Sequence, residues 1–154
     1  MKHKSKQTNL VGEEIVNVKP LIKWAGGKRK LVKKFSHLIP ENYDKYFEPF
    51  VGGGAVFFHL NPKKAVLNDL NGELINTYKI VKKQPNDLME ELDRLQPNVS
   101  SKDFYYDLRS SEAKDNIKRA ARTIYLNKTG FNGMYRVNLK GQFNIPFGDM
   151  KNPK

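Results

Sequence analysis

Two glycine-containing strings in the first third of the chain have the residue types of a nucleotide-like cofactor site. Lys23–Lys28 reads KWAGGK, and about twenty residues later Glu48–Gly54 reads EPFVGGG. A glycine triplet lets a strand turn sharply and lets a ligand approach the backbone, because glycine has no Cβ and tolerates positive φ. A helix that begins after such a turn offers free backbone N–H groups.

An acidic residue fifteen positions after the glycine triplet could complete this site. Asp69 follows Ala65–Leu67, which reads as a buried strand. A carboxylate at the end of such a strand can accept hydrogen bonds from a ribose diol. Asp69 or Asn71 could equally cap the helix predicted from Glu73. The position alone leaves the two roles of Asp69 about even, and the glycine turn favours the ribose role.

The glycine spacing also narrows the kind of cofactor. It is not the G-x-G-x-x-G pattern of dinucleotide sites. Gly52-x-Gly54, with the acidic Glu48 four residues earlier, suits a sulfonium nucleoside better than a pyrophosphate.

Two side chains of the first string are candidates for the same site. Trp24 is the only tryptophan, and it could pack on an adenine or on the aliphatic part of a cofactor. A lone tryptophan usually belongs to a core, but the neighbouring glycines and lysines are poor core context. Lys28 could contact a carboxylate, cap the following helix, or be a solvated lysine of its first turn.

The hydrophobic pattern predicts elements that would position these residues. Helices are predicted by three- and four-residue apolar steps, and strands by short apolar runs. The predicted helices are Lys28–Leu38, Ala55–Leu60, Glu73–Lys82, Asp87–Leu95, 103–110 and 115–128, and the predicted strands are Tyr46–Phe50 and Ala65–Leu67. Strand, glycine turn, helix and strand form a βαβ unit, which implies a parallel sheet and a right-handed crossover. Ligands of such sheets bind beyond the carboxyl ends of the strands.

The last part of the chain has a different hydrophobic pattern. Residues 131–147, hereafter the ribbon, alternate apolar and polar side chains and predict a β-hairpin with Lys140-Gly141 at its tip. Its arginine and asparagine side chains could hold guanine and adenine, and its apolar side chains could meet a thymine methyl. An ordinary hairpin with a solvated polar face explains the same pattern equally well.

Composition limits the class of protein. The chain of 154 residues fits one domain, and its net charge is +12. We infer that this excess positive charge reflects binding to nucleic acid more than a need for solubility alone. There is no cysteine, which excludes disulfides and thiolate metal sites, and three scattered histidines suggest no metal. No apolar run has the length of a membrane span, and we expect a cytoplasmic protein.

Together these strings resemble the Dam-type (D12 class) DNA adenine-N6 methyltransferases, which read GATC and include restriction-modification methylases. The resemblance runs from about Pro20 to the last residue. It implies an α/β fold: an incomplete Rossmann-like S-adenosylmethionine methyltransferase sheet with an inserted helical and β-hairpin DNA-recognition region. It also implies S-adenosyl-L-methionine as cofactor and double-stranded DNA as partner.

The resemblance further implies domains and residue roles. Residues 1–19 would be a basic flexible arm, 20–85 the cofactor-binding part, and 86–154 the target-recognition region. The residues expected to contact the cofactor are Trp24, Lys28, Phe50, Gly52, Gly54 and Asp69. In the ribbon, Arg136 would read guanine, Met134 would meet the thymine methyl and Phe131 would wedge into the duplex. Asn132, Asn138 and Pro146 would lie near the DNA.

The family's catalytic signature, Asp-Pro-Pro-Tyr, follows its DNA-reading region, and this sequence has no such string. In that signature a carboxylate and a carbonyl accept the hydrogens of the adenine amine while the aromatic ring stacks on the flipped base. We therefore expect a fragment or truncated product without the catalytic C-terminal part, with no catalytic residue of its own and inactive alone. A non-catalytic DNA-binding module remains an alternative, as does a nucleotide-dependent oxidoreductase, which the glycine spacing disfavours.

Overall fold

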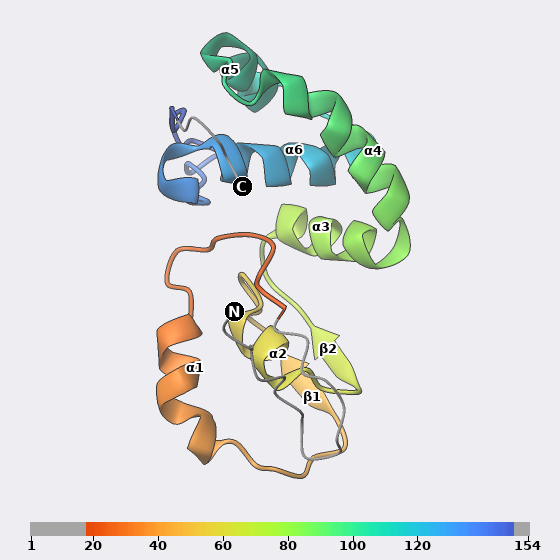
Figure 1. The fold of residues 1–154 in the computed structure, drawn as a ribbon, viewed down its shortest axis with the longest axis vertical. Coiled ribbons are helices and arrows are strands. Elements are labelled where there is room, and N and C mark those ends of the chain that lie inside the picture. Colours follow the sequence, from red (N-terminus) through yellow and green to blue (C-terminus); the bar gives the residue numbers. More distant parts are fainter. Residues whose placement is uncertain (1–17, 150–154) are drawn as a thin grey trace, which may run out of the picture.

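The computed structural model describes residues 18–149. The basic arm expected over residues 1–19 therefore falls almost wholly outside the described residues. In Figure 1 the strands lie with α1 and α2 at one end of the molecule and α4, α5 and α6 lie at the other, with α3 between them. The helices are α1 (Arg29–Phe35), α2 (Ala55–Leu60), α3 (Gly72–Lys83), α4 (Pro85–Leu95), α5 (Lys102–Ser110) and α6 (Asn116–Thr129), and the strands are β1 (Tyr46–Glu48) and β2 (Ala65–Leu67).

The two strands form a parallel sheet in which Tyr46 lies opposite Ala65 and Glu48 opposite Leu67. Helix α2 lies between them in the sequence, so the predicted strand–helix–strand unit with a parallel sheet is confirmed. The expectation that β2 is buried is wrong. Phe47 and its partner Val66 are 62% and 44% exposed, because little of the described chain covers the face that they share.

The helices begin where side chains can accept the free N–H groups of their first turns. Asn71 accepts from the Leu74 N–H at 2.9 Å at the start of α3. Asp115 does the same for two N–H groups at the start of α6, at 2.9 and 3.0 Å. Pro85 opens α4, where its missing N–H costs nothing. The helix bounds predicted from apolar spacing agree closely with the observed ones, and these caps are the local contacts that fix where α3, α4 and α6 begin.

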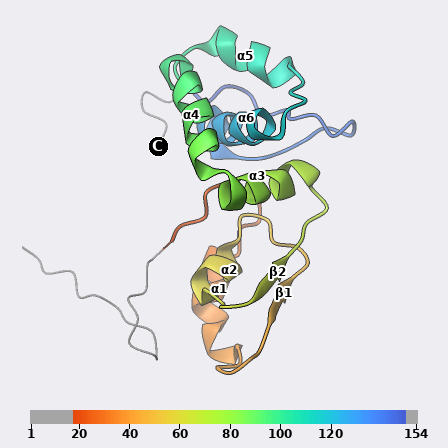
Figure 2. The same cartoon turned by 90° about the vertical axis from the view of Figure 1, so that its right-hand side faces the viewer.

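Helix α6 is the centre of the core (Figure 2). Ala120 and Ala121 on α6 are fully buried and pack in one hydrophobic cluster with Ile80 of α3 and Leu88 of α4. Their small side chains allow those helices to approach closely. The other side of α6 packs against the ribbon in a second cluster, whose buried members are Tyr105, Tyr125, Leu126, Tyr135, Phe143 and Ile145.

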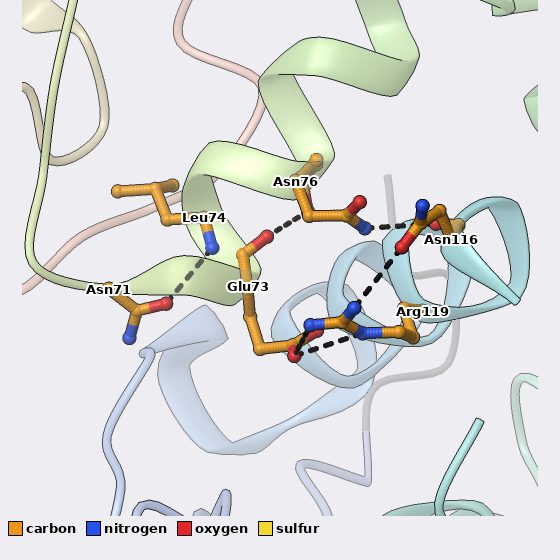
Figure 3. Close-up of polar contacts among 7 residues, drawn as sticks. Asn71, Glu73, Leu74, Asn76, Asn116 and Arg119 are labelled. Atoms are coloured by element: carbon orange, nitrogen blue, oxygen red, sulfur yellow. Dashed lines mark hydrogen bonds and ion pairs between the residues drawn. The ribbon is translucent and has the colours of Figure 1, made fainter. Parts of the chain in front are cut away.

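Polar contacts fix α3 against α6 (Figure 3). The Arg119 guanidinium donates to Glu73 Oε1 from Nη2 at 2.5 Å and from Nε at 3.2 Å. The Asn76 amide donates to the Asn116 carbonyl at 2.9 Å. Both ends of the ion pair are about one-third exposed, so it adds modest stability and mainly sets the register of the two helices.

The ribbon keeps the predicted tip but not a continuous ladder. Isolated antiparallel bridges join Val137 to Phe143 and Gly130 to Phe147. At the tip, the Gly141 N–H donates to the Asn138 carbonyl at 2.9 Å. Phe131–Gly133 forms a 3-10 turn, in contrast to the predicted strand, because Asn132 has a left-handed φ of 57°. Among residues 18–149, no helix has the length and apolarity that a membrane span requires.

We predict that Tyr105→Phe lowers the free energy of unfolding at pH 7 by about 0.5–1.5 kcal/mol. The buried Tyr105 hydroxyl donates to the Ile145 carbonyl at 2.9 Å and anchors the ribbon to α5. The loss lies at the low end of that range because Arg109 also donates to this carbonyl, at 3.1 Å. Urea denaturation measures the difference.

The same variant has a pH signature. Burial raises the pKa of Tyr105 to about 12 from its ordinary 10.0. The stabilisation by the neutral hydroxyl is complete below pH 10 and falls as the pH rises toward 12, because the unfolded chain ionises first. Phenylalanine has no such loss, so the gap between the two proteins should narrow from pH 10 to 12. A gap that stays constant over this range would contradict the prediction.

Candidate functional site

The cofactor loop, residues 23–28, and the glycine turn, Gly52–Gly54, enclose a hollow of about 200 Å³. Five of the six residues expected to contact the cofactor line this hollow: Trp24, Lys28, Phe50, Gly52 and Asp69. The remaining lining residues are Ala25, Gly26, Gly27, Val51, Gly53 and Ala55, which the sequence analysis did not assign individually. The predicted residues thus come together at one end of the strands.

The glycines of the turn have different tasks. Gly52 has φ of 51°, and a Cβ there would lie 3.0 Å from Trp24 Cδ1, so only glycine lets Trp24 reach the turn. Gly54 does not line the hollow. It has φ of 71° and precedes α2, and its missing Cβ makes room for the Phe58 ring and for the Tyr78 hydroxyl of α3.

The structure separates the two candidates for the cap of α3. Asn71 is the cap, whereas Asp69 accepts the Gly52 N–H on Oδ2 at 2.9 Å and the Asn71 N–H on Oδ1 at 3.0 Å. Asp69 therefore ties the glycine turn to the start of α3. A carboxylate has about four lone-pair sites, so each oxygen can still accept a ligand hydroxyl.

Lys28 lines the hollow, and its ammonium group is paired with the buried Glu48. Lys28 Nζ donates to the Phe50 carbonyl at 2.9 Å and lies 3.5 Å from Glu48 Oε1. The other Glu48 oxygen accepts the Tyr46 hydroxyl at 2.8 Å. Burial and this hydrogen bond raise the pKa of Tyr46. Glu48 is 6% exposed and is not a lining residue, so its charge is balanced inside the protein.

Tyr78 of α3 holds the glycine turn through a hydrogen bond, a role that the sequence did not reveal. Its hydroxyl donates to the Gly52 carbonyl at 3.1 Å. Burial, followed by the charges of Glu48 and Asp69, raises the pKa of Tyr78. The hydroxyl therefore stays protonated and remains a donor to the turn. Tyr78 lies four residues after the buried Leu74 on the core face of α3. This helical spacing is the sequence signal that could have indicated the contact between Tyr78 and the turn.

Trp24 is both a wall of the hollow and part of the core. Its ring stacks on Tyr135 of the ribbon, with centroids 4.7 Å apart and planes 17° apart. The two interpretations of the lone tryptophan are thus compatible.

The residues expected to contact DNA lie along the ribbon. Phe131 is 49% exposed, and its N–H donates to the carbonyl of exposed Pro146 at 2.9 Å. Met134 is half-buried against the ribbon cluster. Arg136 is exposed, and its Nε donates to Asn144 Oδ1 at 2.8 Å. Lys23 Nζ donates to the carbonyl of Asn132 at 2.5 Å.

Asn138 holds the tip of the ribbon. Its side-chain oxygen accepts the N–H groups of Lys140 and Gln142, at 2.9 and 3.0 Å. Its amide nitrogen donates to Gln142 Oε1 at 3.1 Å. The side chain therefore shapes the tip from within, which the sequence alone did not indicate.

A second hollow of about 580 Å³ lies between the ribbon and the ends of α5 and α6. It is lined by the arginines Arg109, Arg119 and Arg122 and by ribbon residues that include Asn138, Lys140 and Asn144. These three arginines lie outside the motifs that predicted the functional residues. Burial lowers the pKa of Arg122, whose guanidinium donates to the Leu108 and Arg109 carbonyls at 2.9 and 2.6 Å.

Comparison with known proteins supplies the family. Residues 24–154 match the model of the D12 class N6 adenine-specific DNA methyltransferases. The chain is 49% identical over 152 residues to the Type II methyltransferase M1.LlaDCHI of Lactococcus lactis subsp. cremoris, covering 95% of this chain and 53% of the relative. It is 44% identical over 159 residues to the Type II methyltransferase M.MjaIII of Methanocaldococcus jannaschii, covering 90% and 55%.

A DNA adenine methylase of Vibrio cholerae serotype O1 is 39% identical over 135 residues, covering 86% of this chain and 48% of the relative. The chain thus spans about half the length of the curated relatives that it matches. The matched residues contain the cofactor loop from Trp24, the glycine turn and the whole ribbon. The chain belongs to the D12 class of N6 adenine-specific DNA methyltransferases.

Proposed function

We propose that this chain carries the cofactor-binding and DNA-reading parts of an S-adenosylmethionine-dependent DNA adenine-N6 methyltransferase that acts at GATC. The observation that carries the proposal is the contact between the hollow of the cofactor loop and the ribbon, made by Trp24 on Tyr135. In this proposal a small cofactor site of about 200 Å³ lies beside a partly exposed surface that reads DNA. In this proposal residues 20–85 bind the cofactor and residues 86–154 bind the target, with a Rossmann-like sheet as the frame.

The hollow suits one part of S-adenosylmethionine. Its glycine walls bring backbone close to a ligand, and the Asp69 carboxylate retains acceptor sites for ribose hydroxyls. Trp24 offers an aromatic surface to the adenine or to the methionine chain. The volume of about 200 Å³ is below the about 300–1,000 Å³ of most ligand pockets. The rest of the ligand would therefore extend beyond the lining residues.

The ribbon suits duplex DNA. A two-stranded ribbon fits the major groove, where an arginine fork can hold guanine O6 and N7. Asn144 orients the Arg136 guanidinium through Nε. Phe131 is half-exposed at the base of the ribbon, which supports its proposed role as a wedge between bases. The net charge of +12 adds a sequence-independent attraction for the phosphates.

The bound cofactor would supply the electrophilic sulfonium methyl group. The part that this chain plays is to bind and orient, because methyl transfer depends on holding the reacting atoms in line. The residues named above do this for the nucleoside and for the duplex. The adenine amine itself needs acceptors for its hydrogens, and the sequence has no Asp-Pro-Pro-Tyr string to supply them.

We predict that Asp69→Ala weakens S-adenosylmethionine binding by about 1–3 kcal/mol, because hydrogen bonds to the ribose diol are lost. Isothermal titration calorimetry of the 154-residue chain measures the affinity. Asp69 also holds the Gly52 and Asn71 N–H groups, so the variant should be less stable as well.

Asn71→Ala is the matched control in the same loop. It removes the cap of α3 and should cost about 0.5–2 kcal/mol of stability while leaving cofactor affinity unchanged. If the two variants lose the same cofactor affinity, or if folded Asp69→Ala binds as tightly as the unmodified chain, Asp69 has no role beyond the turn.

We predict that Arg136→Ala costs about 1–3 kcal/mol on a GATC-containing duplex and relaxes the preference at one guanine. Asn144→Ala should have a smaller effect of the same kind, since it frees the guanidinium without removing it. Fluorescence anisotropy with cognate and single-substituted duplexes measures both.

Lys140→Ala is the control for charge. Lys140 lies at the exposed tip, so its loss should weaken binding to all sequences alike and reduce the dependence on salt. An Arg136→Ala variant that loses cognate and non-cognate affinity equally would show that Arg136 contacts phosphate and does not read a base.

A further inference from the structure

The two-stranded sheet is covered on one face only. On the inner face Glu48 is buried, and its partner Leu67 packs against one of the hydrophobic clusters. On the outer face Phe47 and its partner Val66 are exposed. Parallel sheets occur almost only where both faces are covered by other elements. The outer face of β1 and β2 therefore lacks, among the described residues, the cover that such a sheet requires.

The outer edge of β1 is open as well. The Tyr46 N–H donates to the Lys64 carbonyl at 2.9 Å, and the Glu48 carbonyl accepts the Asn68 N–H at 2.8 Å. Both groups point toward β2. Alternate residues of a strand direct their backbone groups to opposite sides, so those of Phe47 point to the other edge. Within residues 18–149 the sheet consists of β1 and β2 alone. An edge of this kind can pair with a strand of another chain.

The position of the cofactor hollow favours this edge of β1 as the place for a further strand. The hollow is lined by Gly52, which follows β1, and by Asp69, which follows β2. In open parallel sheets a ligand binds where the strand order reverses, with strands on both sides of that point. Strand β2 occupies one side of β1. A strand on the other side would complete the crevice.

Exposed apolar side chains gather at the end of the molecule that holds the sheet (Figure 1). Within residues 18–70 the exposed large apolar side chains are Val18, Leu31, Phe35, Leu38, Tyr43, Phe47, Phe50, Val66 and Leu70. Over residues 71–149, a longer stretch, they are Val81, Met89, Phe131 and Leu139. Apolar side chains concentrated at one end of a molecule mark an interaction surface, whereas single exposed ones are ordinary.

Basic side chains border this surface at the amino ends of both strands. Lys45 precedes β1, and its Nζ lies 5.2 Å from the centroid of the Phe47 ring. Lys63 and Lys64 precede β2 and are exposed. A polypeptide that covers Phe47 and Val66 would meet these three lysines. Charge complementarity therefore favours a partner with acidic residues beside its apolar ones.

The lengths of the relatives indicate which polypeptide fits this surface. The match covers 53%, 55% and 48% of the three relatives named above, so each has about as much sequence again outside the match. We propose that the outer face of the sheet and the free edge of β1 dock this unmatched part of a D12-class methyltransferase when it is a separate polypeptide. It adds a strand parallel to β1 and covers Phe47 and Val66. The docking is independent of the proposed function, whereas methyl transfer by the complex rests on it.

The test is co-expression of the full 154-residue chain with the affinity-tagged unmatched part of M1.LlaDCHI of Lactococcus lactis. We expect the two polypeptides to purify together, with one copy of each in the complex by analytical ultracentrifugation. The Phe47 amide lies at the free edge, so it should exchange its hydrogen more slowly in the complex than in the chain alone.

Two charged variants test the face of the sheet. Phe47→Asp and Val66→Asp should each raise the dissociation constant of the complex about ten-fold or more, because burial of a large apolar side chain is lost. Both side chains are exposed, so the unfolding of the chain alone in urea should change little. Met89→Asp is the matched control. Met89 is 54% exposed on α4, away from the sheet, so this variant should bind as the unmodified chain does.

A second pair of variants tests the edge. Phe47→Ala and Phe47→Pro both remove the ring, and only proline also removes the N–H that points away from β2. The proline variant should therefore bind more weakly than the alanine variant. If the proline variant does not fold, hydrogen exchange at the Phe47 amide of the unmodified complex carries this test.

The outcomes separate the docking from the proposed function. The inference fails if no complex forms, if the chain instead pairs with a second copy of itself through Phe47 and Val66, or if the aspartate variants bind no more weakly than Met89→Asp. Methyl transfer is measured separately on a GATC-containing duplex. There the methyl group leaves the sulfonium for the adenine amine, which releases a proton, and S-adenosylhomocysteine remains. A complex that forms as expected but transfers no methyl group would support the docking and contradict the proposed function.

Discussion

The Ile22 backbone and the Trp24 side chain lie so close to Gly53 and Gly52 that neither glycine has room for a side chain. A Cβ on Gly53 would be 2.9 Å from the Ile22 carbonyl oxygen, and one on Gly52 would be 3.0 Å from the Trp24 ring. This approach closes the hollow on one side and fixes the direction of Trp24. Asp69 then holds the turn from the other side through the Gly52 N–H. The position of the proposed cofactor site follows from these contacts and not from the two short strands alone.

The buried amide of Asn127 stabilises the position of the cofactor loop next to the glycine turn. Buried backbone groups need partners, and an unmet one costs about 1–3 kcal/mol. The backbone bonds of Lys23 are partly buried, and their partner is the Asn127 side chain, which lies 104 positions later in the chain. An apolar residue at position 127 would leave the Lys23 N–H and carbonyl without this side-chain partner. Helix α6 therefore supports the cofactor loop through one amide, while its alanines admit α3 and α4 on another face.

The sequence predicted what local chemistry determines. Helix positions followed from the three- and four-residue apolar spacing, the glycine turn from its triplet, and the tip of the ribbon from Lys140-Gly141. Long-range pairings were out of reach. Neither the pairing of Asn127 with Lys23 nor the burial of Glu48 against Lys28 has a sequence signal of its own. The expected burial of β2 failed for the same reason, because burial depends on what packs against the strand and not on its own apolar residues.

Some of the basic side chains make internal contacts that stabilise the fold, and others lie exposed on the surface. Arginines near the second hollow are committed internally: Arg119 to Glu73, and Arg122 to the carbonyls at the end of α5. The planar fork of arginine suits such tasks, whereas lysine acts as a hydrated point charge. Arg136 differs because it is exposed and its Nε donates to the neutral amide oxygen of Asn144. Under the proposed function, surface lysines would supply a general attraction for the duplex, while Arg136 would contribute to discrimination between bases.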